Sequence, residues 1–179
     1  MVFTALDVFT ARLPPLEDER PAAGSALFDY IVGRLLASFH LPGGVAKYYR
    51  GMLAPSLARK TILDEWPAIR AELDAGRPCP LGLVTVRSIN PVHLGKNHQV
   101  LACDYRQRGS RLTIMVYDPN TRPDPIAADH VRIALDLADH EGSASIVHNV
   151  GIDGQIRGFF RVPYHPADPS IITVKPSAT

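Results

Sequence analysis

The chain has 179 residues, of which 46% are apolar and 21% are charged, and its formal net charge is +1. This length and composition are typical of one globular domain with a hydrophobic core of useful size. The two signs of charge are interspersed, which excludes the basic stripe that nucleic-acid-binding proteins present to phosphates.

The sequence carries no signal for a membrane span, a leader or a metal site. No apolar stretch approaches the ~20 residues of a membrane helix, and Met1–Asp7 lacks the basic start of a signal peptide. We therefore expect a cytoplasmic protein without a membrane partner, unless an upstream extension changes this. The seven histidines lack ligand spacing and the two cysteines lack a CxxC partner, so we expect no metal, no cofactor and reduced thiols.

Helices are predicted in the first part of the chain, up to about residue 76, by apolar residues that repeat at helical spacing. Pro14 ends the first helix, which has no capping side chain in front of it, and Ser25 caps the second. The region around Tyr48 is expected to be less regular, and Trp66–Pro67 to interrupt the third helix. The predicted helices cover residues 2–9, 27–39 and 62–73.

Strands are predicted from residue 81 onward, where the apolar pattern becomes extended and is punctuated by Gly, Pro, Asn and Asp. Helices followed by strands predict an α+β domain with a mostly antiparallel sheet. We expect a single domain over residues 1–174, with a helical part to about 76 and a sheet part from about 77, and a frayed tail over 175–179. The predicted strands are 81–86, 98–105, 112–117, 131–137, 145–150 and 156–161.

A predicted hairpin around Gln107–Gly109 brings two polar residues together. A three-residue loop with glycine last fits a type I turn followed by a left-handed bulge, because glycine takes a positive φ without strain. Counting outward places His98 opposite Asp118, with Cβ atoms roughly 5 Å apart. A carboxylate beside an imidazole fixes its tautomer and stabilises its protonated form. The pair therefore predicts a general base for a Cys or Ser nucleophile.

A plainer interpretation of the same residues stays open. Asp118 lies in the stretch Tyr117–Asn120, whose proline and asparagine favour a turn, so its carboxylate would only initiate that turn. His98 would then satisfy a loop carbonyl. Turn chemistry explains this stretch fully, and the spacing alone does not decide between the two interpretations.

Three short motifs resemble the papain-like cysteine peptidases, and most closely the bacterial branch related to bacteriocin-processing peptidases. They are Asn97–Leu101, where the histidine opens a strand, Tyr117–Asn120, where Asp-Pro ends the next strand, and, less specifically, Arg157–Phe160. The resemblance runs across most of the chain. It implies a papain-like α+β fold in which the helical half packs on the antiparallel sheet and the two meet at a cleft.

The resemblance also implies roles for individual residues. His98 matches the general base and Asp118 the residue that orients it, while Gln99 and Asn120 lie near the site without an assigned role. The family's nucleophile is a cysteine at the N-terminus of its buried helix. There the helix dipole and the histidine lower the thiol pKa, and nearby amides form the oxyanion hole. The matching helix here begins at Met1, so that cysteine is absent from this sequence.

No other residue is expected to replace the missing nucleophile. Cys79 lies between two prolines at a strand entrance and is expected to be a packing residue. Cys103 is an odd number of positions from His98 on the same strand, so it should point to the opposite face. Ser25 is already explained as a helix cap.

Two main classes of function follow. The first is a cysteine peptidase or amide hydrolase scaffold for a peptide or small amide substrate, inactive in this sequence. Either the protein continues upstream with the cysteine, or it is a pseudoenzyme that keeps the fold. The second is a non-catalytic module that binds a peptide or small ligand in the same cleft. A structural domain with no ligand site is the remaining alternative.

Overall fold

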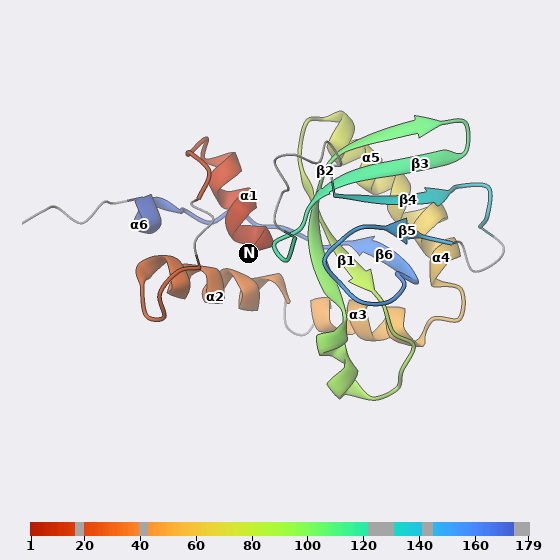
Figure 1. The fold of residues 1–179 in the computed structure, drawn as a ribbon, viewed down its shortest axis with the longest axis horizontal. Coiled ribbons are helices and arrows are strands. Elements are labelled where there is room, and N and C mark those ends of the chain that lie inside the picture. Colours follow the sequence, from red (N-terminus) through yellow and green to blue (C-terminus); the bar gives the residue numbers. More distant parts are fainter. Residues whose placement is uncertain (17–19, 40–42, 122–130, 141–144, 174–179) are drawn as a thin grey trace, which may run out of the picture.

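A computed structural model of the chain describes all residues except 17–19, 40–42, 122–130, 141–144 and 174–179. The described chain forms helices followed by a six-stranded sheet, the α+β class expected from the sequence (Figure 1). The predicted tail, 175–179, lies outside the described residues. The helices are α1 Val2–Thr10, α2 Ala26–Ser38, α3 Gly43–Leu53, α4 Leu57–Lys60, a π-helical turn Thr61–Glu65, α5 Trp66–Asp74, a 3₁₀ helix Pro91–Lys96 and α6 Ser170–Thr173. The strands are β1 Cys79–Val84, β2 His98–Arg108, β3 Arg111–Tyr117, β4 Arg132–Asp136, β5 Val147–His148 and β6 Gly158–Arg161.

The first two helices follow the prediction, and the third element differs from it. The Ser25 hydroxyl accepts a hydrogen bond from the Phe28 amide, which is the predicted cap of α2. The region around Tyr48 is helix α3, so the expectation of irregular structure there is wrong. Its two leading glycines lower helix propensity, but Tyr48 and Met52 are buried on one side of the helix. Tertiary packing of these side chains outweighs the local preference.

The helix before the sheet starts earlier than predicted and continues through Pro67. Proline has no amide hydrogen and would normally break an α-helix. The π-helical turn directly before Pro67 widens the backbone and allows the helix to continue as α5. The buried Thr61 hydroxyl in this turn donates to the Phe159 carbonyl at 2.8 Å and accepts from the Phe159 amide at 2.9 Å. This hydroxyl thereby satisfies the outer edge of β6, the last strand of the sheet.

The sheet is antiparallel throughout, in the order β5-β4-β3-β2-β1-β6. Two hydrophobic clusters cover it. An inner cluster lies on the face of Val100 and Ala102 and includes Trp66 from α5. An outer cluster lies on the face of Leu101 and includes Phe3 of α1 together with residues of α3. Strand β1, the first three residues of β6 and Val100–Ala102 of β2 are therefore buried between the two clusters, whereas most of β2 beyond Ala102 is exposed.

The predicted hairpin loop Gln107–Gly109 is wrong. Strands β2 and β3 are joined by two residues, Gly109 and Ser110, and the positive φ of 60° falls on Gly109. Glycine at the first of two loop positions is typical of a type II′ turn, whose twist matches that of the flanking strands. The sequence correctly indicates Gly109 as a turn residue, but the loop has two residues rather than the predicted three.

A bulge changes the register further along the same hairpin. Cys103 is the extra residue between Ala102 and Asp104, and beyond it Leu101 pairs with Tyr117. Asp118 follows Tyr117 and so lies level with position 100, two residues from His98, rather than opposite it. A shift of two residues keeps both side chains on the same face, because strand side chains alternate with period two.

The last two strands are shorter than predicted. Strand β5 is limited to Val147–His148, and Ile146 forms only an isolated bridge to Ile156. The chain turns at residues 150–154, where Gly154 has a φ of 92°. Strand β6 begins at Gly158, where an added Cβ would come within 2.6 Å of Leu57 and 2.7 Å of Thr61. The glycine permits the close approach of α4 to the sheet.

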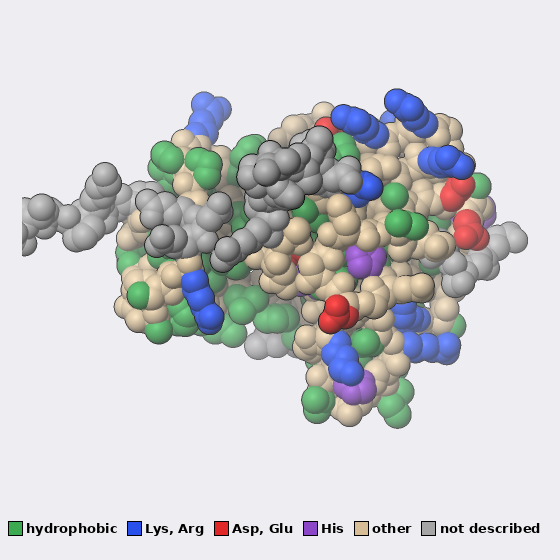
Figure 2. All heavy atoms as spheres, viewed as in Figure 1, with side chains coloured by type: hydrophobic (Ala, Val, Ile, Leu, Met, Phe, Trp, Pro, Cys, Tyr) green, Lys and Arg blue, Asp and Glu red, His purple; other side chains and the backbone are tan. Residues whose placement is uncertain are grey.

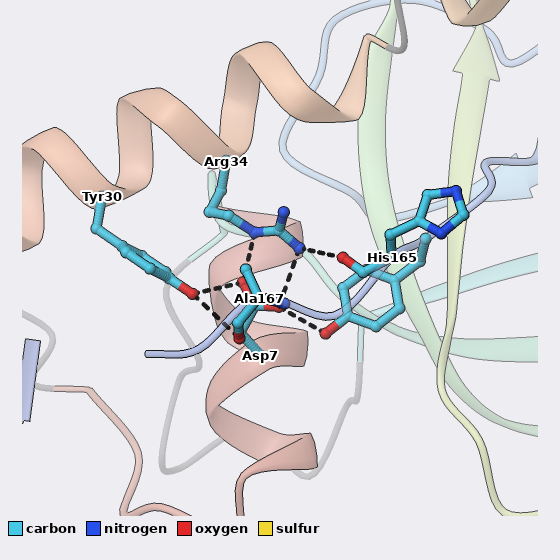
Figure 3. A network of polar contacts seen from close by, with 6 residues as sticks. Asp7, Tyr30, Arg34, His165 and Ala167 are labelled. Atoms are coloured by element: carbon cyan, nitrogen blue, oxygen red, sulfur yellow. Dashed lines mark hydrogen bonds and ion pairs between the residues drawn. The ribbon is translucent and has the colours of Figure 1, made fainter. Parts of the chain in front are cut away.

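A buried carboxylate joins the helical part to the segment after β6. Asp7 of α1 is 1% exposed and accepts hydrogen bonds from both Arg34 and Tyr30 of α2 (Figure 3). It also accepts from the Tyr164 hydroxyl at 2.6 Å and the Ala167 amide at 3.0 Å. Burial and the Asp7 carboxylate raise the pKa of Tyr30 to about 12, so its hydroxyl stays protonated and donates. Arg34 makes a bidentate ion pair, the geometry that best offsets loss of water around a charge.

We predict that Arg34→Met lowers the free energy of unfolding by about 3–5 kcal/mol, because it leaves the Asp7 carboxylate buried without its counter-ion. Urea unfolding followed by circular dichroism measures this. The matched variant Tyr30→Phe removes a neutral donor from the same carboxylate and should cost about 1 kcal/mol. A cost for Arg34→Met no larger than that for Tyr30→Phe would contradict a charge-based role of the pair.

Candidate functional site

The start of β2 is held in place by side chains on both sides of the strand. The Asn97 side chain accepts a hydrogen bond from the Thr85 amide at 3.2 Å and donates one to the Leu94 carbonyl at 3.1 Å. The Tyr48 hydroxyl donates to the carbonyl of His98 at 3.2 Å. These contacts fix the backbone from which the His98 ring projects.

His98 and Asp118 form a hydrogen-bonded pair at this end of the sheet. The His98 Nε2 atom lies 2.8 Å from Asp118 Oδ1. The histidine side chain is 13% exposed and the aspartate side chain is fully buried. The sequence prediction that the two residues share a face and a contact is therefore correct, although the register used to reach it was not.

The Asp118 carboxylate is held by the chain on all sides. Its Oδ1 also accepts from the Asn120 amide at 2.9 Å, while its Oδ2 accepts from the Thr121 hydroxyl at 3.0 Å and the Gly151 amide at 2.6 Å. Burial by itself raises the pKa of Asp118, but the hydrogen bonds from His98 and the two amides outweigh it and lower the pKa to about 2. Asp118 is therefore a fixed anion at neutral pH.

A fixed anion at Nε2 sets the protonation pattern of the neutral His98 ring. Nε2 carries the proton and donates it to the carboxylate, which leaves Nδ1 with a lone pair. No residue in the described part of the chain hydrogen-bonds Nδ1. The open nitrogen can accept a proton from a neighbouring thiol, hydroxyl or water, and Asp118 would stabilise the imidazolium so formed.

Gly151 closes the site from a distant loop and must be glycine. An added Cβ would lie 2.8 Å from Thr121 Oγ1 and 3.1 Å from the backbone of Asn120. The close packing of this loop on the turn after β3 brings the Gly151 amide to the carboxylate. No local pattern in the sequence pairs Gly151 with Asp118, since the two are far apart in the chain, so its part in the site was missed.

The other predicted site residues have different placements. Asn120 is at the site through its backbone amide, and its own side chain is exposed. Gln99 pairs with Gly82 and follows His98 directly, so it lies on the opposite face of β2. The hydroxyl of Thr121, which was not predicted, is a direct partner of Asp118. Its signal was the turn itself, in which a polar side chain two or three residues after an aspartate often bonds back to it.

Neither cysteine is near the His98 ring. Cys103 lies in the bulge five residues along β2, roughly 16 Å away by strand rise. Cys79 pairs with Ala102, four residues from His98, which places it roughly 13 Å away. Burial raises the pKa of Cys103 and raises that of Cys79 to about 12, so neither thiol is activated. Ser25 forms the predicted cap.

Helix α1 begins inside the protein. Val2, Phe3 and Thr4 are all buried, and no side chain caps the first amides of the helix. The Thr4 hydroxyl has no hydrogen-bond partner in the described chain. Phe3 and Val2 pack in the outer cluster with Leu101, three residues along β2 from His98. His98 lies on the face of Val100, the inner face of the sheet, whereas the start of α1 packs against the outer face.

The chain matches no protein-family model, no curated protein and no solved structure in the comparisons made. Over the residues that the structure describes, no helix is both long and apolar enough to cross a bilayer. The same residues contain no cluster of three or more His, Cys, Asp or Glu side chains suited to a metal ion.

We predict that Asp118 stabilises the fold above pH 4 and that this contribution is lost at lower pH. Its folded pKa is lowered, so the ionised form is the one that folding favours, and the contribution falls as pH drops from about 4 toward 2. The stability difference between the native chain and Asp118→Asn should shrink by roughly 2 kcal/mol between pH 5 and pH 2.

Urea unfolding at several pH values measures this difference. The control Asp153→Asn removes an exposed carboxylate and should change stability by less than about 0.5 kcal/mol at any pH. A difference between the native chain and Asp118→Asn that does not depend on pH would show that the carboxylate is not held as an anion.

Proposed function

We propose that the chain is a papain-like cysteine hydrolase scaffold for a peptide or small amide substrate, in which His98 is the general base and Asp118 orients it. The observation that carries the proposal is the 2.8 Å bond from Nε2 to a buried carboxylate that has every other partner supplied by the chain. A carboxylate that served only to start a turn would not need to hold an imidazole ring as well.

The chemistry follows from the open Nδ1 atom. This nitrogen takes the proton of a thiol, and the thiolate attacks the carbonyl carbon of an amide bond. The resulting imidazolium is stabilised by Asp118 and later returns the proton to the leaving amine. A separate water molecule then hydrolyses the acyl-enzyme, with His98 acting as base once more.

The start of α1 is the proposed position of the nucleophile. A helix N-terminus carries a partial positive charge, which stabilises a thiolate, and its free amides can bind an oxyanion. The first turn of α1 supports this role because it is buried and has no side-chain cap.

The sequence in hand is proposed to be inactive. The Met1 thioether has no S–H proton for His98 to remove, and Cys79 and Cys103 lie too far from His98. A nucleophile encoded upstream would make the protein a hydrolase, and its permanent absence would make it a pseudoenzyme that binds a ligand at the same site. The intact His98 and Asp118 pair favours the hydrolase, because a binding module needs no general base.

A cysteine installed at position 1 tests the proposal. We expect Met1→Cys, in a chain that carries a short N-terminal extension and Cys103→Ser, to react with iodoacetamide at pH 6 at least ten times faster than the same chain with His98→Ala. The reason is that His98 and the helix start lower the thiol pKa. The measurement is the rate of alkylation by mass spectrometry as a function of pH.

The native chain, in which Cys103 is the exposed thiol, provides the matched control. Its alkylation rate should not change on His98→Ala, because Cys103 lies five residues along the strand. Equal rates for the position-1 cysteine with and without His98 would contradict the proposed hydrolase and leave the ligand-binding module as the better account. Thermal unfolding of both variants confirms that the comparison is between folded chains.

A further inference from the structure

A cavity of about 770 Å³ opens beside the C-terminal half of α1. Its walls are α1, the turn between α5 and β1, and the segment that follows β6. Neither His98 nor Asp118 lines it, so it is separate from the site described above. Cavities of 300–1,000 Å³ are the size class that binds small organic ligands.

The wall formed by the segment after β6 is fixed by hydrogen bonds to the helices. Tyr164 lines the cavity and donates its hydroxyl to the buried Asp7, while Arg34 donates to the carbonyl of His165 at 2.8 Å. In Figure 3 these contacts tie the segment after β6 to α1 and α2. These hydrogen bonds fix that wall of the cavity, which reduces the entropy lost on binding.

The interior of the cavity is mostly apolar. Phe9 of α1 and Leu13, which follows that helix, line one wall, and Pro78, Pro163 and Pro166 line the other two. Phe9 is 59% exposed although the rest of α1 before it is largely buried. A large apolar side chain left open to a concave surface favours an apolar ligand group.

The polar groups of the cavity carry an excess of positive charge. Arg77 and Arg161 both pair with Glu72, with Arg77 Nε at 2.7 Å from Oε2 and Arg161 Nη1 at 3.1 Å from Oε1. One carboxylate thus serves two guanidinium groups, and all three residues line the cavity. The carboxylate of a ligand would neutralise the remaining positive charge and could accept hydrogen bonds from the two planar guanidinium groups.

We propose that this cavity binds a small amphipathic anion, an apolar chain or ring bearing one carboxylate. The carboxylate pairs with Arg77 and Arg161, and the apolar part lies against Phe9 and Leu13. The two arginines favour an anion over a neutral ligand, and the apolar walls favour a ligand with an apolar chain or ring. This site is independent of the proposed hydrolase, since no residue of the His98 and Asp118 pair takes part.

Isothermal titration calorimetry of the full chain with sodium decanoate, below its micellar concentration, tests this site. We expect saturable binding of decanoate at one site and weaker binding of neutral 1-decanol. Arg161→Gln should weaken decanoate binding about tenfold, because it removes a charged hydrogen bond. Glu72→Gln should tighten it several-fold, because both arginines become available to the ligand.

Two further variants separate the apolar and charged parts. Phe9→Ser should weaken decanoate and decanol alike, because it removes an apolar wall. The control Arg108→Gln changes a charge on the β2–β3 hairpin, where Lys and Arg side chains gather in Figure 2 and no residue lines the cavity, and should change neither affinity. The absence of saturable decanoate binding would overturn the proposal. So would equal affinities for decanoate and decanol, or Glu72→Gln leaving decanoate affinity unchanged or weaker.

Discussion

The buried carboxylate of Asp118 is the constraint on which the candidate site depends. It draws hydrogen bonds from the start of β2, from the turn after β3 and from the loop at Gly151. A charge removed from water must be satisfied by protein donors, so the three segments can pack only in the arrangement that supplies them. Orientation of the His98 ring is therefore a consequence of folding rather than a separate event. The site is rigid because loosening it would leave the buried Asp118 carboxylate without its hydrogen-bond donors.

Asp7 has the same physical role in the helical part of the molecule. Its carboxylate gathers α1, α2 and the segment after β6, with Arg34 as the counter-ion. Asp118 differs because its partner is a histidine, whose ring nitrogens can both give and take a proton. Asp7, paired with an arginine that stays protonated, suits a permanent structural bond. Asp118 suits a site at which a proton moves.

The sequence predicted the parts of this structure that local patterns determine. The apolar period predicted α1 and the approximate positions of the strands along the chain, and Ser25 was predicted as the cap of α2, because these features depend on neighbours in the chain. The hairpin register was missed because the loop has two residues rather than three and because the bulge at Cys103 adds one residue to β2, which no short pattern marks. Helix α3 was missed because burial of Met52 outweighs two glycines. Gly151 was missed because its amide comes from a distant loop, which no short-range pattern encodes.

Asp118 holds the His98 ring by Nε2 and leaves Nδ1 open. Long-range ¹H–¹⁵N NMR correlation of the histidine ring nitrogens, with His98→Gln to assign the signals, measures this directly. The account predicts that the neutral His98 ring carries its proton on Nε2, with Nδ1 unprotonated. A ring protonated on Nδ1, or one that exchanges between both tautomers, would contradict it.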